Sequence, residues 1–262
     1  MAAPAPITVR YGPLAGQEGD LHLPARGGAP VVCLLHGGFW RMPYGREQLD
    51  AVARDLAARG FAAWNLEYRR LGAAGGGWPG TFDDVAAGID RLAGLVEEGV
   101  ALDLDRVVVC GHSAGGHLAL WSAARGRGGE GRGARGIRVR AVAGAAPLAD
   151  LVRVHELGLG GGAVGELLGG APDEMPGRFR AASPLALLPL GVPQLLLHGS
   201  ADAAVPLEIS RAYCRAARAA GDEVELVELP GAGHMDFLDP ASPAHAALCG
   251  WLARCHGGRV SS

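Results

Sequence analysis

One serine stands where a hydroxyl could act as a nucleophile. Ser113 lies in the stretch VVVCGHSAGGHLALW, residues 107–121, between an apolar run and a helical pattern. Gly111 and Gly115, two positions away on either side, leave room for a tight turn that would push the hydroxyl into the open. A serine hydroxyl is a poor nucleophile at neutral pH, so it needs a base within reach and an acid that orients the base.

The base and the acid are expected downstream, each after an apolar run. Asp202 follows PQLLLHGS, and His234 lies in the glycine-flanked loop of ELPGAGHMDF. If both runs are strands of a parallel sheet, these side chains meet Ser113 at the carboxyl edge of that sheet. We predict His234 as the base and Asp202 as the orienting acid. The other candidates for the acid, all carboxylates near the same strand ends, are Asp150, Asp236 and Asp239.

Attack by a serine creates an oxyanion, which needs hydrogen-bond donors. The backbone N–H of Ala114 is one candidate, because it follows the nucleophile at the start of a predicted helix. A second donor is expected from HGGFW, residues 36–40, where glycines let the backbone approach a substrate closely. The candidates in this loop are Gly37, Gly38 and Phe39, and the sequence does not tell which amide points inward.

The remaining histidines suggest supporting roles. We expect His36 to brace the oxyanion loop, His198 to brace the loop of Asp202, and His117 to be a packed residue. Two histidines at metal-ligand spacing with a third ligand are not visible, so no metal is predicted. Neither a Gly-x-Gly-x-x-Gly after the first core strand nor a P-loop occurs, so no nucleotide cofactor is predicted.

Apolar runs alternate with helical patterns along the whole chain. Because the runs are continuous, they predict a mostly parallel sheet of about eight strands, buried by helices on both faces, which is an α/β fold. Residues 7–12 and 20–25 alternate better and predict an antiparallel edge. Thr81 and Asp84 suggest a capping box. The apolar runs lie at 30–38, 61–69, 106–110, 139–147, 193–200 and 223–231, and the helical patterns include 46–60, 207–220 and 243–255.

Two segments interrupt this alternation. Residues 151–190 are too long for a simple crossover, and their helix-like pieces predict a small cap over the site. The segment RGRGGEGRGARG, residues 125–136, contains no aromatic residue and is read as a solvated loop rather than an RNA-binding tract. The sequence shows no internal repeat and no sign of a second domain, so residues 1–262 are expected to form a single domain.

Composition limits the partners. The net charge of −3 suggests no nucleic-acid partner, and no apolar run is long enough to cross a membrane. Five cysteines, an odd number, together with no visible signal peptide, predict free thiols in the cytoplasm. The sequence leaves the oligomeric state open, a homodimer included.

The motifs HGG, GHSAGG, HG followed by Asp202, and GAGH stand in the order of the α/β-hydrolase superfamily, which nearly the whole chain resembles. HGGFW with GHSAGGHL resembles the branch of kynurenine formamidases (arylformamidases) and related carboxylesterases. There are two departures. Phe39 replaces the third glycine of the HGGG of related esterases, and Gly116 replaces the alanine of the usual SAGAHL.

The resemblance implies acyl transfer to water through an acyl-enzyme on Ser113. It suggests a serine esterase acting on small substrates, with an arylformamidase acting on N-formyl aryl amides as the alternative. A non-catalytic member of the fold that binds a small ligand is a third reading. Phe39, Trp40 and Phe237 would give the substrate a flat apolar wall, which suits an aryl or short acyl group.

Overall fold

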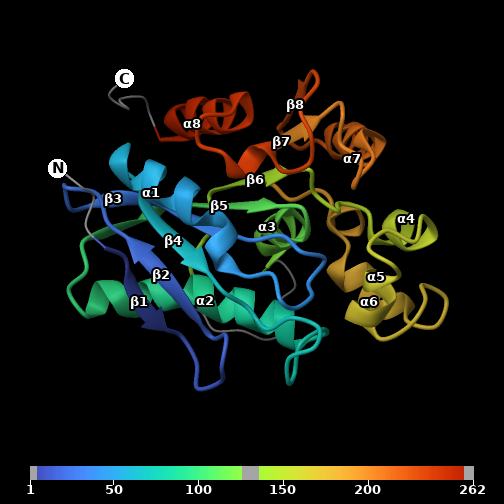
Figure 1. Cartoon of the computed structure of the whole chain (residues 1–262), viewed down its shortest axis with the longest axis horizontal. Helices are drawn as coiled ribbons and strands as arrows, with labels where there is room; N and C mark the ends of the chain where they lie inside the picture. Colours follow the sequence, from blue (N-terminus) through green and yellow to red (C-terminus); the bar gives the residue numbers. More distant parts are fainter. Residues whose placement is uncertain (1–4, 126–135, 257–262) are drawn as a thin grey trace.

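The computed structural model describes residues 5–125 and 136–256. Most of the arginine- and glycine-rich segment 125–136, for which a solvated loop is predicted, lies outside the described residues. The chain is organised around one eight-stranded sheet with the order β1-β2-β4-β3-β5-β6-β7-β8 (Figure 1). The strands are β1 Ile7–Arg10, β2 Glu18–His22, β3 Ala29–Leu35, β4 Ala62–Leu66, β5 Leu102–His112, β6 Ala141–Ala145, β7 Gln194–Gly199 and β8 Val224–Leu229.

The sheet is parallel except at one edge. β1 pairs antiparallel with β2, and β2 pairs antiparallel with β4, whereas all pairings from β4 to β8 are parallel. This confirms the predicted mostly parallel α/β sheet and its antiparallel edge. The carboxyl ends of β3 and of β5 to β8 therefore open on one side of the molecule, where the loops with the candidate residues begin.

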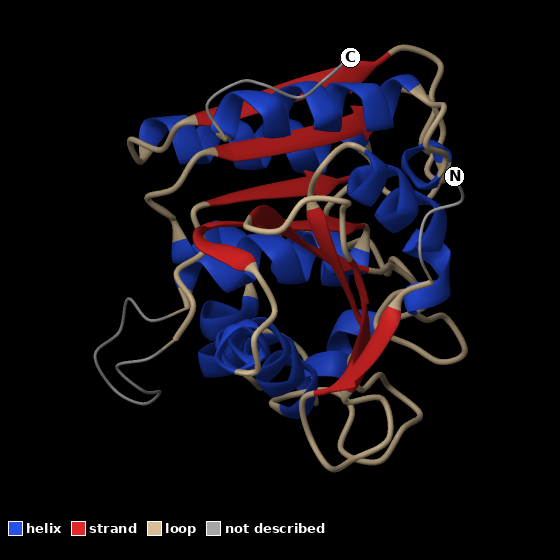
Figure 2. Cartoon of the chain, turned by 90° about the vertical axis from the view of Figure 1, so that its left-hand side faces the viewer, coloured by secondary structure: helices blue, strands red, loops and turns tan. Residues whose placement is uncertain are grey.

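Helices cover both faces of the sheet, as Figure 2 shows. Successive residues of β3 alternate between two apolar cores: Val31 and Cys33 pack with α2, α3 and α7, and Val32 packs with α1 and α8. Burial on both faces explains why the strands read as continuous apolar runs. Among the described helices, none has the length and hydropathy needed to cross a bilayer. The helices are α1 Asp50–Ala58, α2 Gly80–Glu97, α3 Ala114–Ala124, α4 Leu151–Glu156, α5 Ala163–Leu168, α6 Pro176–Ala182, α7 Leu207–Ala219 and α8 Pro243–Cys255, with 3₁₀ turns η1 Arg46–Leu49, η2 Pro184–Leu187 and η3 Asp236–Leu238.

The predicted capping box at the start of α2 is wrong. α2 begins at Gly80 without a side-chain cap. The hydroxyl of Thr81 donates instead to the carbonyl of Arg69, at 2.6 Å, and Asp84 accepts two hydrogen bonds from the Arg69 guanidinium, each at 2.7 Å. A charge-assisted hydrogen bond from arginine is stronger than one from a free helix amide, so the carboxylate of Asp84 binds Arg69 and does not cap the helix.

The insertion after β6 folds as short helices. Residues 151–190 contain α4, α5, α6 and η2, which gather beyond the carboxyl ends of the strands, on the right of Figure 1. Arg41, just after HGGFW, donates to the carbonyl of Gly160 and forms an ion pair with Glu166 of α5. The insertion is therefore fastened to the loop that follows β3.

Candidate active site

Ser113 occupies the sharp turn between β5 and α3. Its backbone angles, φ 55° and ψ −117°, lie in a region that costs a non-glycine residue about 1–3 kcal/mol. The turn is also crowded: a Cβ on Gly111 would lie 2.1 Å from the carbonyl oxygen of Gly115, and one on Gly115 would lie 2.0 Å from that of Leu35. Only glycine fits at these two positions, so the spacing seen in the sequence reflects close backbone packing around a strained serine.

His234 and Asp202 are paired. The loop after β8 carries His234, and its Nδ1–H donates to Oδ2 of Asp202 at 2.7 Å. The carboxylate can only accept, so the proton is fixed on Nδ1 and Nε2 keeps a lone pair. The imidazole is 16% exposed and the carboxylate is 1% exposed. This is the tautomer in which an imidazole can act as a base.

Asp202 lies in a setting that keeps it ionised. Its Oδ1 accepts from the backbone N–H groups of Ala204 and Val205, both at 2.8 Å. Burial alone would raise the pKa of Asp202, but hydrogen bonds from His198, His234 and Val205 outweigh it and hold the pKa well below its usual range. His198 also donates from Nε2 to the carbonyl of Val205, at 2.9 Å, so it braces this loop as expected.

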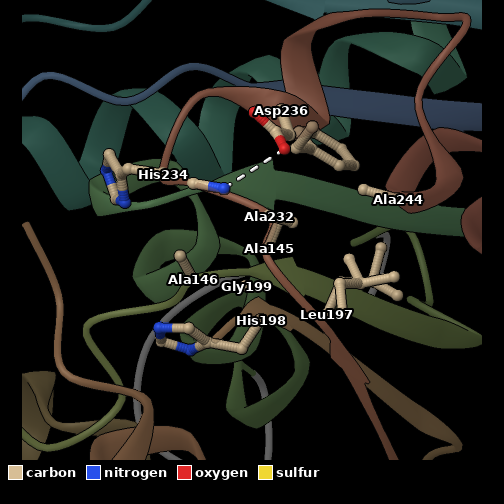
Figure 3. Close-up of a pocket in the computed structure, with 12 residues that line it drawn as sticks. Ala145, Ala146, Leu197, His198, Gly199, Ala232, His234, Asp236 and Ala244 are labelled. Carbon is tan, nitrogen blue, oxygen red and sulfur yellow. Dashed lines mark hydrogen bonds between the residues drawn. The ribbon is translucent and has the colours of Figure 1, made fainter. Parts of the chain in front are cut away.

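The alternative acids are used by the local backbone. Asp150 caps α4 by accepting from the N–H groups of Val152 and Arg153. Asp236 accepts from the N–H of Gly233 within the loop of His234, as the dashed line in Figure 3 shows. Asp239 likewise accepts from Ala241. The structure pairs His234 with Asp202 and with none of these three carboxylates.

His112 connects the turn of Ser113 to the loop of His234. Its Nε2–H donates to the backbone carbonyl of His234 at 2.8 Å, and the two rings lie 4.6 Å apart. Burial lowers the pKa of His112 to about 4, with a further contribution from the charge of His234, so the ring is neutral. Among the described residues, Ser113 Oγ itself makes no hydrogen bond to His234. The role of His112 was missed in the sequence, because only the fold shows what a strand-end side chain meets.

The HGGFW loop passes directly beside Ser113. A Cβ on Gly37 would lie 3.3 Å from Cβ of Ser113. Three consecutive residues have left-handed backbone: Gly38 at φ 102°, Phe39 at φ 49° and Trp40 at φ 55°. No backbone hydrogen bond between described residues uses the N–H groups of Gly38, Phe39 or Ala114. Donors from two chain segments therefore border the serine.

His36 supports this loop from the strand side. Its Nε2 lies 2.8 Å from Oε1 of Glu67, and its Nδ1 lies 2.8 Å from the carbonyl of Gly37. The ring stacks on Tyr68, with centroids 4.2 Å apart, and the Tyr68 hydroxyl donates to the carbonyl of His36. The brace expected from the sequence is present, and Glu67 and Tyr68 complete it.

The three aromatic residues expected to form a substrate wall differ in exposure. Trp40 is fully buried, and its Nε1–H donates to His117, so the expectation that it lines a wall is wrong. The left-handed backbone turns its indole into the core, which residue type alone cannot show. Phe39 is half-buried against Gly160 of the insertion. Phe237 is buried but lines a small cavity with His234 and Asp236, the region drawn in Figure 3.

One further cluster contains side chains of metal-ligating type. In the described part of the chain, His245 donates from Nε2 to Asp55, at 2.6 Å, and lies 3.3 Å from Sγ of Cys249. Arg59 binds the same carboxylate, so the charge of Asp55 is already balanced. The cluster joins α1 to α8 across 190 positions of sequence, which is why spacing did not reveal it.

Comparisons with known proteins identify the family of the chain. A family model described as BD-FAE matches residues 20–216, three quarters of the chain. The chain is 29% identical to esterase LipC of Mycobacterium tuberculosis, over 88% of this chain and 60% of that protein. It spans 50% to 60% of the length of the curated relatives that it matches.

Solved structures show the same fold. A truncated carbohydrate esterase from gut microbiota has a TM-score of 0.84 at 20% identity, with 98% of each chain covered. Esterase 2 of Thermogutta terrifontis, phosphoramylated by tabun, has a TM-score of 0.77 at 23% identity, covering 97% of this chain and 96% of that one. The kynurenine formamidase branch is not confirmed by these comparisons. With its strained serine turn, its strand order and the matched family model, the chain belongs to the BD-FAE family of the α/β-hydrolase superfamily.

Proposed function

We propose that the protein is a serine hydrolase that cleaves small carboxylic esters through an acyl-enzyme. One observation carries the proposal: His234, held by Asp202 in the tautomer of a base, follows a strand that ends at the same sheet edge as the strained Ser113. The relatives reported above are esterases, which supports an ester rather than an N-formyl amide as the substrate.

In the proposed mechanism, Ser113 Oγ attacks the acyl carbon while His234 Nε2 takes the hydroxyl proton. The N–H groups of Ala114 and of residues 37–39 stabilise the oxyanion. His234 then gives the proton to the leaving alcohol, and an acyl-enzyme remains on Oγ. Water attacks this ester with His234 again as the base, which releases the acid and restores the serine.

This mechanism requires Oγ and Nε2 to come within hydrogen-bond distance when a substrate binds. Catalytic hydrogen bonds that are long or absent in a free enzyme commonly form in the complex. Asp202 stabilises the imidazolium that appears at this point, because its carboxylate is buried, ionised and held by two backbone N–H groups.

We also propose the cytoplasm as the compartment. All five cysteines are free, four of them buried in the cores and one exposed, as expected of a chain kept in a reducing environment.

The serine can be tested directly. We expect a fluorophosphonate probe to label the wild type, and Ser113→Ala to abolish both labelling and hydrolysis of p-nitrophenyl acetate. Loss of Ser113 or His234 should lower kcat by about 10⁴-fold or more, because triad members act as a unit. Ser122→Ala in α3 is the control, since that hydroxyl donates only to the helix carbonyl of Ala119.

Two outcomes would change the assignment. A folded wild type that is neither labelled nor active would indicate a non-catalytic ligand-binding protein. Turnover of N-formylkynurenine far above that of p-nitrophenyl acetate would instead indicate an arylformamidase, because both reactions need the same residues.

A further inference from the structure

A buried histidine links three segments around the candidate site. His117 lies in α3, one turn after Ser113, and its N–H donates to the carbonyl of Ser113 at 3.0 Å. Its side chain joins Trp40 of the HGGFW loop to Ala182, the last residue of α6 in the insertion. Trp121 of α3 also donates to α6, at Ala181, but of these two side chains only His117 continues to the loop.

The two partners of His117 fix its protonation state. Trp40 Nε1–H donates to Nδ1 at 3.2 Å, and Nε2–H donates to the carbonyl of Ala182 at 2.9 Å. An indole can only donate and a carbonyl can only accept, so one neutral tautomer satisfies both. Burial lowers the pKa of His117 to about 4, with the bond to Ala182 opposing this, so the neutral ring is the form present at neutral pH.

The loop that His117 holds is strained and needs an anchor. Trp40 is the last of three left-handed residues, and two of them carry side chains that disfavour this conformation. The Trp40 indole meets the His117 ring edge-on, with centroids 5.1 Å apart. Because Trp40 directly follows the predicted oxyanion donors, a shift of its indole would displace their N–H groups relative to Ser113.

We propose that His117 is a positioning residue that holds the HGGFW loop in place relative to Ser113 through the indole of Trp40. Its second bond, to Ala182, ties this arrangement to the insertion. The proposal rests on the proposed function, because the groups it positions are the oxyanion donors. A role in packing alone would affect stability, whereas positioning affects the rate of the chemical step.

A pair of variants separates the two bonds. In His117→Asn the amide oxygen reaches about as far as Nδ1 and can still accept from Trp40. In His117→Gln the amide nitrogen reaches about as far as Nε2 and can still donate to Ala182, but the acceptor for Trp40 is displaced. kcat is measured with p-nitrophenyl acetate and divided by the fraction of sites that a fluorophosphonate probe titrates, so that misfolded protein does not count.

We expect His117→Gln to lower kcat per titrated site by about 10²-fold, the usual effect of a misplaced oxyanion donor, with KM changed less than about threefold. His117→Asn should lose less than about tenfold. Trp40→Phe, which removes the donor and keeps an aromatic ring, should resemble His117→Gln, and the double variant should be no worse than either single one.

Three results would overturn the proposal: unchanged kcat per titrated site in His117→Gln, equal losses in Asn and Gln, or additive losses in the double variant. The proposed function fails separately, if the wild type is neither labelled nor active. In that case hydrogen exchange of residues 36–42 still tests the anchor. It should be about tenfold faster in His117→Gln than in His117→Asn, and equal rates would overturn it.

Discussion

Asp202 shows how surroundings decide which carboxylate can serve a base. Asp150 and Asp202 both follow a buried strand at the same sheet edge, and the sequence favoured Asp202 while keeping Asp150 as an alternative. Asp150 accepts two backbone N–H groups of α4 with one oxygen, whereas Asp202 accepts two with Oδ1 and turns Oδ2 to His234. Only the second carboxylate is hydrogen-bonded to an imidazole.

The pair of aspartates gives a matched test. Asp202→Asn keeps the shape of the side chain but removes its charge, so it no longer fixes the proton on Nδ1 of His234 or stabilises the imidazolium. We therefore expect kcat to fall by about 10²–10⁴-fold. Asp150→Asn should change kcat by less than about threefold, because asparagine caps helices as well as aspartate does. Both are measured with p-nitrophenyl acetate at pH 7.5. A larger loss in Asp150→Asn would reverse the assignment of the acid.

At the residue scale, the type and order of residues were enough to select candidate residues, but they did not predict which side chains contact one another. Ser113, Asp202 and His234 could be selected as candidates because glycine spacing and strand ends mark them. The wall assigned to Trp40 was wrong because the sign of φ at a non-glycine residue is set by its surroundings. His112 and His117 flank the serine in the same stretch, yet their partners lie in loops far along the chain, so sequence did not show what they hold.

At the scale of elements, the turn from β5 to α3 depends on a contact with β3. A Cβ at Gly115 would lie 2.0 Å from the carbonyl oxygen of Leu35, and that backbone is held between β4 and β5. Gly250 of α8 offers a contrast, because a Cβ there would meet nothing within 4 Å. A side chain at Gly115 would therefore clash with fixed backbone, whereas a side chain at Gly250 has room, so substitutions at the two positions should change stability in opposite directions.

We expect Gly115→Ala to lower the free energy of unfolding by about 2–4 kcal/mol, since overpacking against fixed backbone cannot relax. Gly250→Ala should raise it by about 0.5–1 kcal/mol, because alanine has the better helix propensity. Urea unfolding monitored by circular dichroism measures both. Wild-type stability in Gly115→Ala would show that the turn is less tightly packed than described.

The elements themselves were predicted unevenly. The helix expected at 243–255 is α8 Pro243–Cys255. β4, β6, β7 and β8 lie within the apolar runs that predicted them, whereas β3 begins one residue before its run and β5 extends beyond the run 106–110 at both ends. The insertion was predicted only as helix-like pieces, because α4, α5 and α6 have six or seven residues, too few to show a helical period. The start of α2 was misread because Thr81 and Asp84, which looked like a capping box, form hydrogen bonds with Arg69 instead.

At the scale of the whole molecule, the strand order could not be predicted from the sequence. β3 pairs with both β4 and β5, and a pattern of apolar runs does not show which strands are neighbours.

The pKa values of buried groups determine how the stability of the whole molecule depends on pH. Burial would raise the pKa of Glu67 and Asp202, but their histidine partners and other hydrogen bonds and charges outweigh it and lower both. Burial lowers the pKa of His112 and His117 to about 4.

These shifts predict acid sensitivity. A histidine with a lowered pKa takes up a proton first in the unfolded chain, so stability falls as the pH drops from about 6.5 to 4. Carboxylates with lowered pKa values stabilise the fold above about pH 4, and that contribution is lost as they protonate below it. We expect Tm to be steady from pH 7 to 8, to decline below about 6.5 and to drop more steeply below 4. Scanning calorimetry measures this, and a constant Tm down to pH 4 would contradict it.

The distribution of the three side chains along the chain has a consequence for biosynthesis. Ser113 directly follows β5, whereas Asp202 and His234 follow β7 and β8, which come later in the chain. β8 is also the outer strand of the sheet, so it can be added after the others have paired. If the site works as proposed, Ser113 has no proton acceptor until β8 has been synthesised and has paired with β7. We therefore expect a chain in which β8 has not yet docked to resist acylation at Ser113.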